Sequence, residues 1–136
     1  MYQRLDVTLA PDLLRQCQRL IDSIDITPGV DGSCSSDPTV TRGLFEPVLK
    51  EVVPWRWASV MLMALSPGCV IPGHTDGYTL AQRYHLPLVS NDRCWVFHDK
   101  TWEQLEVGGL YTMDPRVLHG AVNWGATMRV HVIVDR

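Results

Sequence analysis

The feature that most constrains the fold of this chain is a succession of short β-type segments that fills its second half. These segments are rich in β-branched and aromatic residues, and turn-forming clusters such as Ser66-Pro67-Gly68 and Asp114-Pro115 separate them. The predicted strands span residues 57–65, 84–89, 94–97, 110–113, 121–124 and 128–134. Many short strands with closely spaced turns are typical of an antiparallel barrel or jelly roll.

The first part of the chain has a different pattern. A short strand is predicted at residues 7–9, and apolar side chains then recur at helical spacing over residues 11–23, with Pro11 suited to a first helical turn. The segment 27–41 is rich in Gly, Ser, Asp and Pro and is predicted to be a long loop, with a second short helix at 44–52. We therefore expect a mainly β fold with one or two N-terminal helices packed on the sheet.

Length and charge narrow the class of protein. A chain of 136 residues suits a single domain, with a helical and loop part at 1–54 and a β core at 55–136. Hydrophobic residues make up 46% and charged residues 20% of the chain, and the formal net charge is -3. This balance offers no electrostatic footprint for nucleic acid or an anionic membrane, so we expect neither as a partner.

The cysteines and the N-terminal residues indicate a reducing compartment. The four cysteines fall at wide intervals without a CxxC pair, which favours free thiols over disulfides or a zinc ribbon. The first residues lack the apolar core of a signal peptide, and no stretch approaches membrane-spanning length. A soluble, cytoplasmic protein is the expectation, and the sequence does not indicate its oligomeric state.

The triplet His74-Thr75-Asp76 is the strongest candidate for chemistry. Residues two apart in an extended segment project from the same face, so His74 and Asp76 would present an imidazole and a carboxylate together. A third ligand from a distant strand would complete the two-histidine, one-carboxylate set of non-haem Fe(II) oxygenases, and His119 is the best candidate. The structural alternative is a hydrogen-bonded pair in the loop after a Pro-Gly turn.

The end of the chain is predicted to form a hairpin. His119 precedes a turn near residues 124–127 and Arg129 follows it, so the two side chains are predicted to lie close together across an antiparallel pair. Along the last strand, Arg129, His131 and Ile133 share one face, and three valines share the other. If the barrel holds a ligand, we expect the polar face to line it and the valine face to pack against helices.

Taken together, these motifs resemble a known family. The residues are His74-Thr75-Asp76, Arg83-Tyr84-His85-Leu86-Pro87-Leu88, Trp102-Glu103, His119, and Arg129-Val130-His131-Val132-Ile133-Val134-Asp135. The set is similar to the aspartyl/asparaginyl β-hydroxylase branch of Fe(II)/2-oxoglutarate-dependent dioxygenases, over roughly residue 57 to the C-terminus. The resemblance implies a double-stranded β-helix, which is the cupin-like jelly roll.

The resemblance also implies roles for single residues. His74 and His119 would ligate iron together with Asp76, a carboxylate that vertebrate aspartyl hydroxylases lack at this position. Arg129 would pair with the far carboxylate of 2-oxoglutarate, a role that suits the planar guanidinium fork. Two further cofactor-binding residues, Arg83 and His85, would contact the co-substrate near the metal. At Met63 the family carries a hydroxyl, so one contact to 2-oxoglutarate lacks its usual residue.

The implied activity is hydroxylation of a C–H bond with O2 as oxidant and with release of succinate and CO2 from 2-oxoglutarate. No catalytic side chain is needed beyond the metal ligands. The substrate would be an amino-acid-like small molecule or a protein side chain. Two alternatives stay open: a small cupin-like metal-binding protein that does not use 2-oxoglutarate, and a ligand-binding barrel without metal.

Overall fold

The computed structural model describes residues 1–28, 33–53, 56–77 and 82–136. It contains two helices, α1 (Pro11–Ile21) and α2 (Pro38–Leu49), within these residues. The strands are β1 (Gln3–Thr8), β2 (Ile26–Pro28), β3 (Ser33–Ser36), β4 (Ser59–Leu65), β5 (Val70–His74), β6 (Arg83–Val89), β7 (Cys94–His98), β8 (Thr101–Glu103), β9 (Gly109–Met113), β10 (His119–Asn123) and β11 (Arg129–Asp135). The mainly β fold predicted from the sequence is confirmed.

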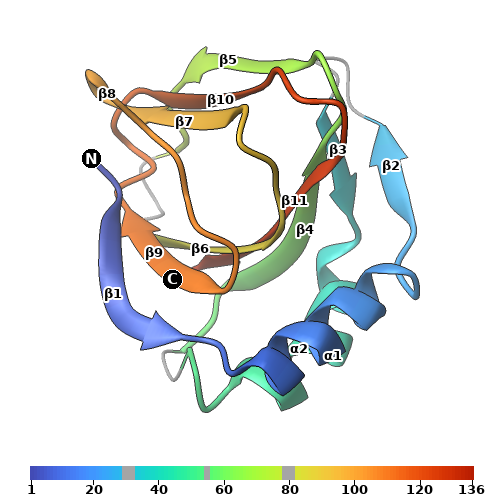
Figure 1. Ribbon diagram of the computed structural model, residues 1–136. Coiled ribbons are helices and arrows are strands. Elements are labelled where there is room, and N and C mark those ends of the chain that lie inside the picture. The colour runs from blue at the N-terminus through green and yellow to red at the C-terminus, as the bar shows by residue number, and fades with distance from the viewer. Residues whose placement is uncertain (29–32, 54–55, 78–81) are drawn as a thin grey trace.

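Two antiparallel sheets face each other to form the jelly roll (Figure 1). The larger sheet has the strand order β1-β9-β6-β11-β4-β3-β2, and the smaller one has the order β5-β10-β7-β8. Strand β11 pairs along its whole length with β4 and with β6, so it lies at the centre of the larger sheet. Strand β10 lies between β5 and β7 in the smaller sheet.

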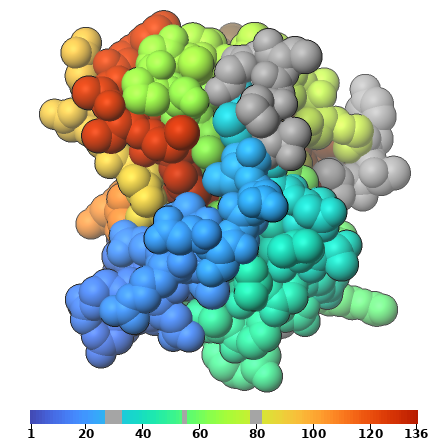
Figure 2. All heavy atoms as spheres, turned by 90° about the vertical axis from the view of Figure 1, so that its right-hand side faces the viewer, coloured from blue at the N-terminus to red at the C-terminus, as the bar shows by residue number. Residues whose placement is uncertain are grey.

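Both helices cover the outer face of the larger sheet, on the side away from the smaller sheet (Figures 1 and 2). Cys17 of α1 and Phe45 and Leu49 of α2 are fully buried in the core between helices and sheet. The valines of β11 belong to this core, as predicted for that face of the strand. Their burial fixes the register of β11, because a shift of one residue would turn the valines away from the helices.

The opposite face of β11 points into the space between the sheets. Arg129 and Ile133 line a cavity there, together with Met61 and Met63 of β4. This agrees with the predicted division of β11 into a polar, ligand-facing side and an apolar, helix-facing side. A second, smaller core cluster, which includes Leu65 and Val96, closes the space between the sheets.

The predicted terminal hairpin is wrong. The strand of His119 pairs with β5 and β7, and the strand of Arg129 pairs with β4 and β6, so the two strands belong to different sheets. The connection through residues 124–128 crosses from one sheet to the other. His119 and Arg129 therefore line the same cavity from opposite sheets and are not neighbours across a ladder.

The predicted long loop at 27–41 is also wrong where the structure describes it. Ser33–Ser36 forms β3, and α2 begins at Pro38, well before the predicted helix at 44–52. The Asp37 side chain accepts hydrogen bonds from the backbone N–H groups of Thr39 and Val40, which is a helix N-cap. Residues 29–32 of this segment, and residues 54–55 at the expected boundary of the β core, lie outside the described residues.

Two further expectations concern the cysteines and the membrane. Cys17, Cys34, Cys69 and Cys94 are all free, as predicted. Within the described residues, neither helix has the length and apolar character needed to cross a membrane.

Candidate metal centre and anion site

A cavity of about 260 Å³ lies between the two sheets. The smaller sheet contributes His119 to its wall, and the larger sheet contributes Arg129. The other two predicted metal ligands, His74 and Asp76, line the same cavity. The three predicted metal ligands and Arg129, which come from distant parts of the sequence, therefore line one cavity.

The fold itself brings the two histidines together. His74, the last residue of β5, lies directly opposite His119, the first residue of β10, in the antiparallel ladder. Their ring centroids are 4.4 Å apart. The backbone N–H of Asp76 donates to the carbonyl of Pro115 at 2.9 Å, which fixes the chain just beyond β5. One ligating atom from each of His74, Asp76 and His119 lies within 4.8 Å of the others.

Backbone carbonyls fix the orientation of both imidazole rings. Nδ1 of His74 lies 2.8 Å from the carbonyl oxygen of Pro72, and Nδ1 of His119 lies 2.7 Å from that of Val117. A carbonyl only accepts, so each Nδ1 carries the proton and donates it, which leaves Nε2 of each neutral ring with a lone pair. Carbonyls that hold Nδ1 in this way are the usual partners of metal-ligating histidines.

Both Nε2 atoms face the same carboxylate. Nε2 of His74 is 3.7 Å from Oδ1 of Asp76, and Nε2 of His119 is 3.2 Å from Oδ2. Nε2 of His119 is buried and makes no hydrogen bond with the described residues, because the short contact joins two acceptors. Burial also lowers the pKa of His119, which favours the neutral ring. Lone pairs that converge on a carboxylate fit a cation between them, so the residues present suit a divalent metal.

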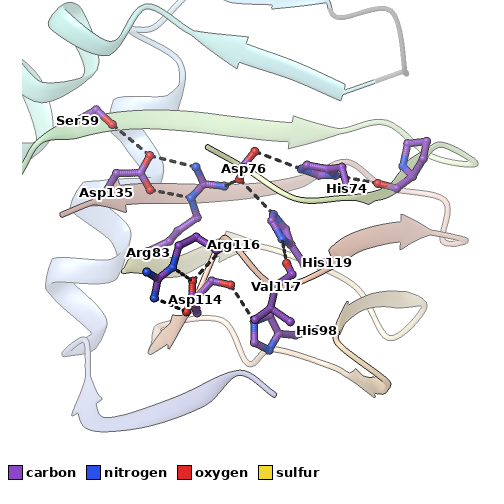
Figure 3. A network of polar contacts seen from close by, with 11 residues as sticks. Ser59, His74, Asp76, Arg83, His98, Asp114, Arg116, Val117, His119 and Asp135 are labelled. Atoms are coloured by element: carbon purple, nitrogen blue, oxygen red, sulfur yellow. Dashed lines mark hydrogen bonds and ion pairs between the residues drawn. The ribbon is translucent and has the colours of Figure 1, made fainter. Parts of the chain in front are cut away.

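A network of ion pairs holds Asp76 from behind (Figure 3). Nη1 of Arg83 donates to Oδ2 of Asp76 at 2.6 Å, and Nε and Nη2 of Arg83 donate to the two oxygens of Asp135 at 2.7 and 3.1 Å. Burial lowers the pKa of Arg83, but its bonds to Asp135 and Asp76 outweigh burial, and the pKa is raised. The sequence did not predict these ion pairs, which occupy much of the Arg83 guanidinium.

Arg129, unlike Arg83, has no carboxylate partner among the described residues. Its side chain is buried with 3% of the residue exposed, and its Nε has no hydrogen-bond partner among the described residues. None of the ion pairs formed by the described residues involves Arg129. Burial lowers the pKa of Arg129, with only the phenol of Tyr2 and the thiol of Cys94 acting against it. A buried cation without a counter-ion is costly, and its position on the cavity wall makes the cavity a site for an anion.

A pair of buried histidines, His85 and His131, lies near Arg129, and His85 forms part of the cavity wall. Nδ1 of His85 lies 3.2 Å from Nδ1 of His131, so one ring donates and the other accepts. Burial holds the pKa of both rings well below the usual value, and both are neutral at pH 7. Nε2 of His85 is buried without a partner among the described residues, and His85 lines the cavity. This atom is therefore available to a bound ligand.

Two groups at this site were not predicted from the sequence. Tyr2, which lies just before β1, lines the cavity about seventy residues before the first predicted ligand, and no local pattern marked it. Asp135 is the second carboxylate on Arg83, and it was noted only as the end of the last motif. Asp135 lies an even number of residues after Arg129 and Ile133, so it shares their inward face of β11. This period-two spacing could have predicted its place at the site.

Comparison with known proteins gives one match by sequence and several by structure. A family model described as aspartyl/asparaginyl beta-hydroxylase matches residues 29–136. No curated protein sequence matches the chain.

Among solved structures, HygX from Streptomyces hygroscopicus, with nickel, 2-oxoglutarate and hygromycin B bound, has a TM-score of 0.72 at 9% identity, over 98% of this chain and 81% of that one. A prolyl hydroxylase from Trichoplax adhaerens, in complex with a hypoxia inducible factor peptide, has a TM-score of 0.70 at 12% identity, over 98% and 82%. A viral collagen prolyl hydroxylase from Paramecium bursaria Chlorella virus-1 has a TM-score of 0.68 at 14% identity, over 98% and 93%. At these identities the likeness establishes the double-stranded β-helix fold.

Proposed function

The chain belongs to the aspartyl/asparaginyl β-hydroxylase family, and from this premise we propose that it is an Fe(II)- and 2-oxoglutarate-dependent dioxygenase that hydroxylates a C–H bond. The observation that carries the proposal is the pairing of two sites in one cavity. A cluster of three metal-type ligands lies in the same cavity as a buried guanidinium that lacks a counter-ion. A metal and an anionic co-substrate are the two partners that such a cavity needs.

His74, Asp76 and His119 would hold the Fe(II). The bound metal supplies the chemistry that activates O2 together with the co-substrate, which leaves as succinate and CO2. The protein supplies the geometry: Pro72 and Val117 hold the two rings, and the two histidines with one carboxylate leave positions free for other ligands. These positions are what an oxygenase requires for co-substrate and O2.

Arg129 would bind the far carboxylate of 2-oxoglutarate. The planar guanidinium can donate two parallel hydrogen bonds to a carboxylate, and the low-dielectric surroundings strengthen both. The neutral His85 would donate from Nε2 to the co-substrate if His131 donates to Nδ1 of His85. Arg83 lines the cavity too, but its bonds to Asp76 indicate that it also orients this metal ligand.

A cupin-like metal-binding protein that does not use 2-oxoglutarate is the alternative. It would account for the His-Asp-His cluster equally well. It gives no reason to bury Arg129 without a carboxylate partner, because an unpaired buried cation destabilises a protein that never binds an anion there. The unpaired guanidinium favours the oxygenase.

The substrate class is a further part of the proposal. The two prolyl hydroxylases act on residues of polypeptides by name, and HygX binds hygromycin B, so the fold accepts both kinds of ligand. We propose an amino-acid-like small molecule or an exposed protein side chain as substrate.

Two measurements test the proposed function. Anaerobic titration with Fe(II) should give one bound ion per chain, and His119→Ala should abolish it while Arg129→Ala retains it. A screen of amino acids and peptides should then find compounds that stimulate release of succinate from 2-oxoglutarate. Iron bound as expected, with no 2-oxoglutarate binding or turnover under any condition, would favour the alternative. Unchanged iron binding in His119→Ala would remove this residue from the metal site.

A further inference from the structure

We propose that Tyr2 is a second anchor for the anionic co-substrate, and that its phenol hydroxyl donates a hydrogen bond to the same carboxylate that Arg129 binds. This inference rests on the proposed use of 2-oxoglutarate. It assigns a binding role to a residue outside the matched region, which begins at residue 29. Three observations lead to it.

The first observation is the position of the ring. Tyr2 is 5% exposed and lines the cavity. Its ring meets His85 edge to face, with centroids 5.1 Å apart, and also lies against His98 at 5.9 Å. Its backbone N–H donates to Oε2 of Glu103 at 2.7 Å, and the amino group of Met1 contacts His98. These contacts fix the start of β1 and hold the phenol in the cavity wall.

The second observation is the electrostatic surroundings of the hydroxyl. Among charged groups, Arg129 acts most strongly on the Tyr2 phenol, followed by Arg83. In the other direction, the Tyr2 phenol is the ionisable group that acts most strongly on Arg129. Tyr2 and Arg129 also line the same cavity, so the phenol and the guanidinium that lacks a counter-ion can meet one ligand there. Burial raises the pKa of Tyr2 to about 12, so the hydroxyl keeps its proton and can donate it.

The third observation is that the hydroxyl of Tyr2 is free to make a hydrogen bond. The Tyr2 hydroxyl makes no hydrogen bond with the described residues, although buried tyrosine hydroxyls usually find a partner. Met63 of β4 also lines the cavity and offers only a thioether. The phenol of Tyr2 can therefore supply a hydroxyl donor to a carboxylate bound there. Since Tyr2 lies just before β1 and Arg129 lies on β11, the carboxylate would be held from two directions.

The test is equilibrium binding of 2-oxoglutarate to protein loaded with Mn(II), by calorimetry without O2. Tyr2→Phe keeps the ring and its packing on His85, and it removes only the hydroxyl. We expect the dissociation constant for 2-oxoglutarate to rise about tenfold or more, because a hydrogen bond to a charged group is lost. Binding of 2-oxobutyrate, which has the 2-oxo acid group but no far carboxylate, should not change.

The matched control is Tyr111→Phe. Tyr111 is a buried tyrosine on the neighbouring strand β9, and its hydroxyl accepts from the backbone N–H of Glu106 at 2.9 Å. Tyr111→Phe should leave the affinity for 2-oxoglutarate unchanged. In the Arg129→Met background, the effect of Tyr2→Phe should shrink, because the two residues hold one group.

The outcomes separate this inference from the proposed function. If wild-type protein binds neither ligand, the proposed function fails. If wild-type protein binds 2-oxoglutarate, Arg129→Met weakens binding and Tyr2→Phe does not, the role of Tyr2 is overturned. Equal weakening for both ligands would place the contact away from the far carboxylate and would also overturn it. Weakening by Ser33→Ala in place of Tyr2→Phe would assign the contact to Ser33, the hydroxyl on β3 that lines the same cavity.

Discussion

Replacing Arg129 with methionine should have opposite effects on stability and on ligand binding. Methionine has a similar volume, reaches about as far as Nε of arginine and carries no charge, so it keeps the apolar packing without a guanidinium. In the ligand-free protein Arg129 is a buried charge with no carboxylate partner. Replacement of buried ion pairs by apolar side chains of similar volume is often neutral or stabilises proteins by about 1–4 kcal/mol, and the unpaired Arg129 lacks even the attraction of a partner. We expect the free energy of unfolding of ligand-free Arg129→Met to exceed that of wild type within this range.

The same change should nearly remove stabilisation by 2-oxoglutarate. Loss of a charge-assisted bond to a carboxylate costs about 2–3 kcal/mol, which is roughly a hundredfold in affinity. At a concentration one hundred times its dissociation constant, a ligand stabilises wild type by about 2.7 kcal/mol. The variant, with the ligand then near its own dissociation constant, would gain only about 0.4 kcal/mol.

Thermal unfolding of the metal-loaded protein, with and without 2-oxoglutarate, measures both effects. For a chain of this size, 1 kcal/mol shifts the midpoint by about 3–5 °C. Wild type should be the less stable protein without ligand, and its midpoint should rise more when the ligand is added. Arg116→Met is the control, since it removes an exposed guanidinium that pairs with Asp114. The reasoning is refuted if Arg129→Met lowers the midpoint without ligand and responds to 2-oxoglutarate as wild type does.

Three further predictions follow from the described contacts. Arg83→Met should lower the free energy of unfolding by about 3 kcal/mol, because it leaves the buried carboxylate of Asp135 without its partner, and denaturant titration would measure this loss. Burial depresses the pKa of His85 and His131, so below about pH 6.5 the unfolded chain takes up more protons than the folded one. The contribution of each ring to the free energy of unfolding is complete above about pH 6.5 and falls by up to about 1.4 kcal/mol per pH unit below it. Urea titrations at pH 7.5, 6.5 and 5.5 can check this. A flat profile over this interval would contradict the buried neutral pair. Gly120→Ala should reduce Fe(II) affinity and the unfolding midpoint, because its Cβ would lie 2.6 Å from a carbonyl oxygen of β5, the strand that ends at the proposed ligand His74. Equal affinity and midpoint would show that β5 adjusts freely.

The central strands and the cluster of His74, Asp76 and His119 could be predicted from the sequence. Period-two patterns reveal strands whose faces differ, and β11 alternates cleanly because one face packs on helices and the other lines a cavity. The pairing of the strands could not be predicted from the sequence. His119 and Arg129 are separated by a short connection that looks like a hairpin turn, but whether such a connection closes a ladder or crosses between sheets depends on the partners available to each strand.

The polar elements of the first half were missed for a related reason. Strand β3 consists of serines and a cysteine, and no local pattern marks it as a core element. The hydroxyl of Ser36 is satisfied by groups outside the strand: Oγ of Ser36 lies 2.5 Å from the hydroxyl of Thr41 and accepts from the backbone N–H of Leu62. The start of α2 did have a local signal, since Asp37 followed by Pro38 is a typical N-cap and first turn.

The carbonyls that hold Nδ1 of His74 and His119 have a consequence for how quickly the protein would take up the proposed metal. Each ring is already held in the orientation of a ligand, so an arriving ion waits for no ring rotation. Uptake of the ion should therefore be limited by the loss of its own hydration shell.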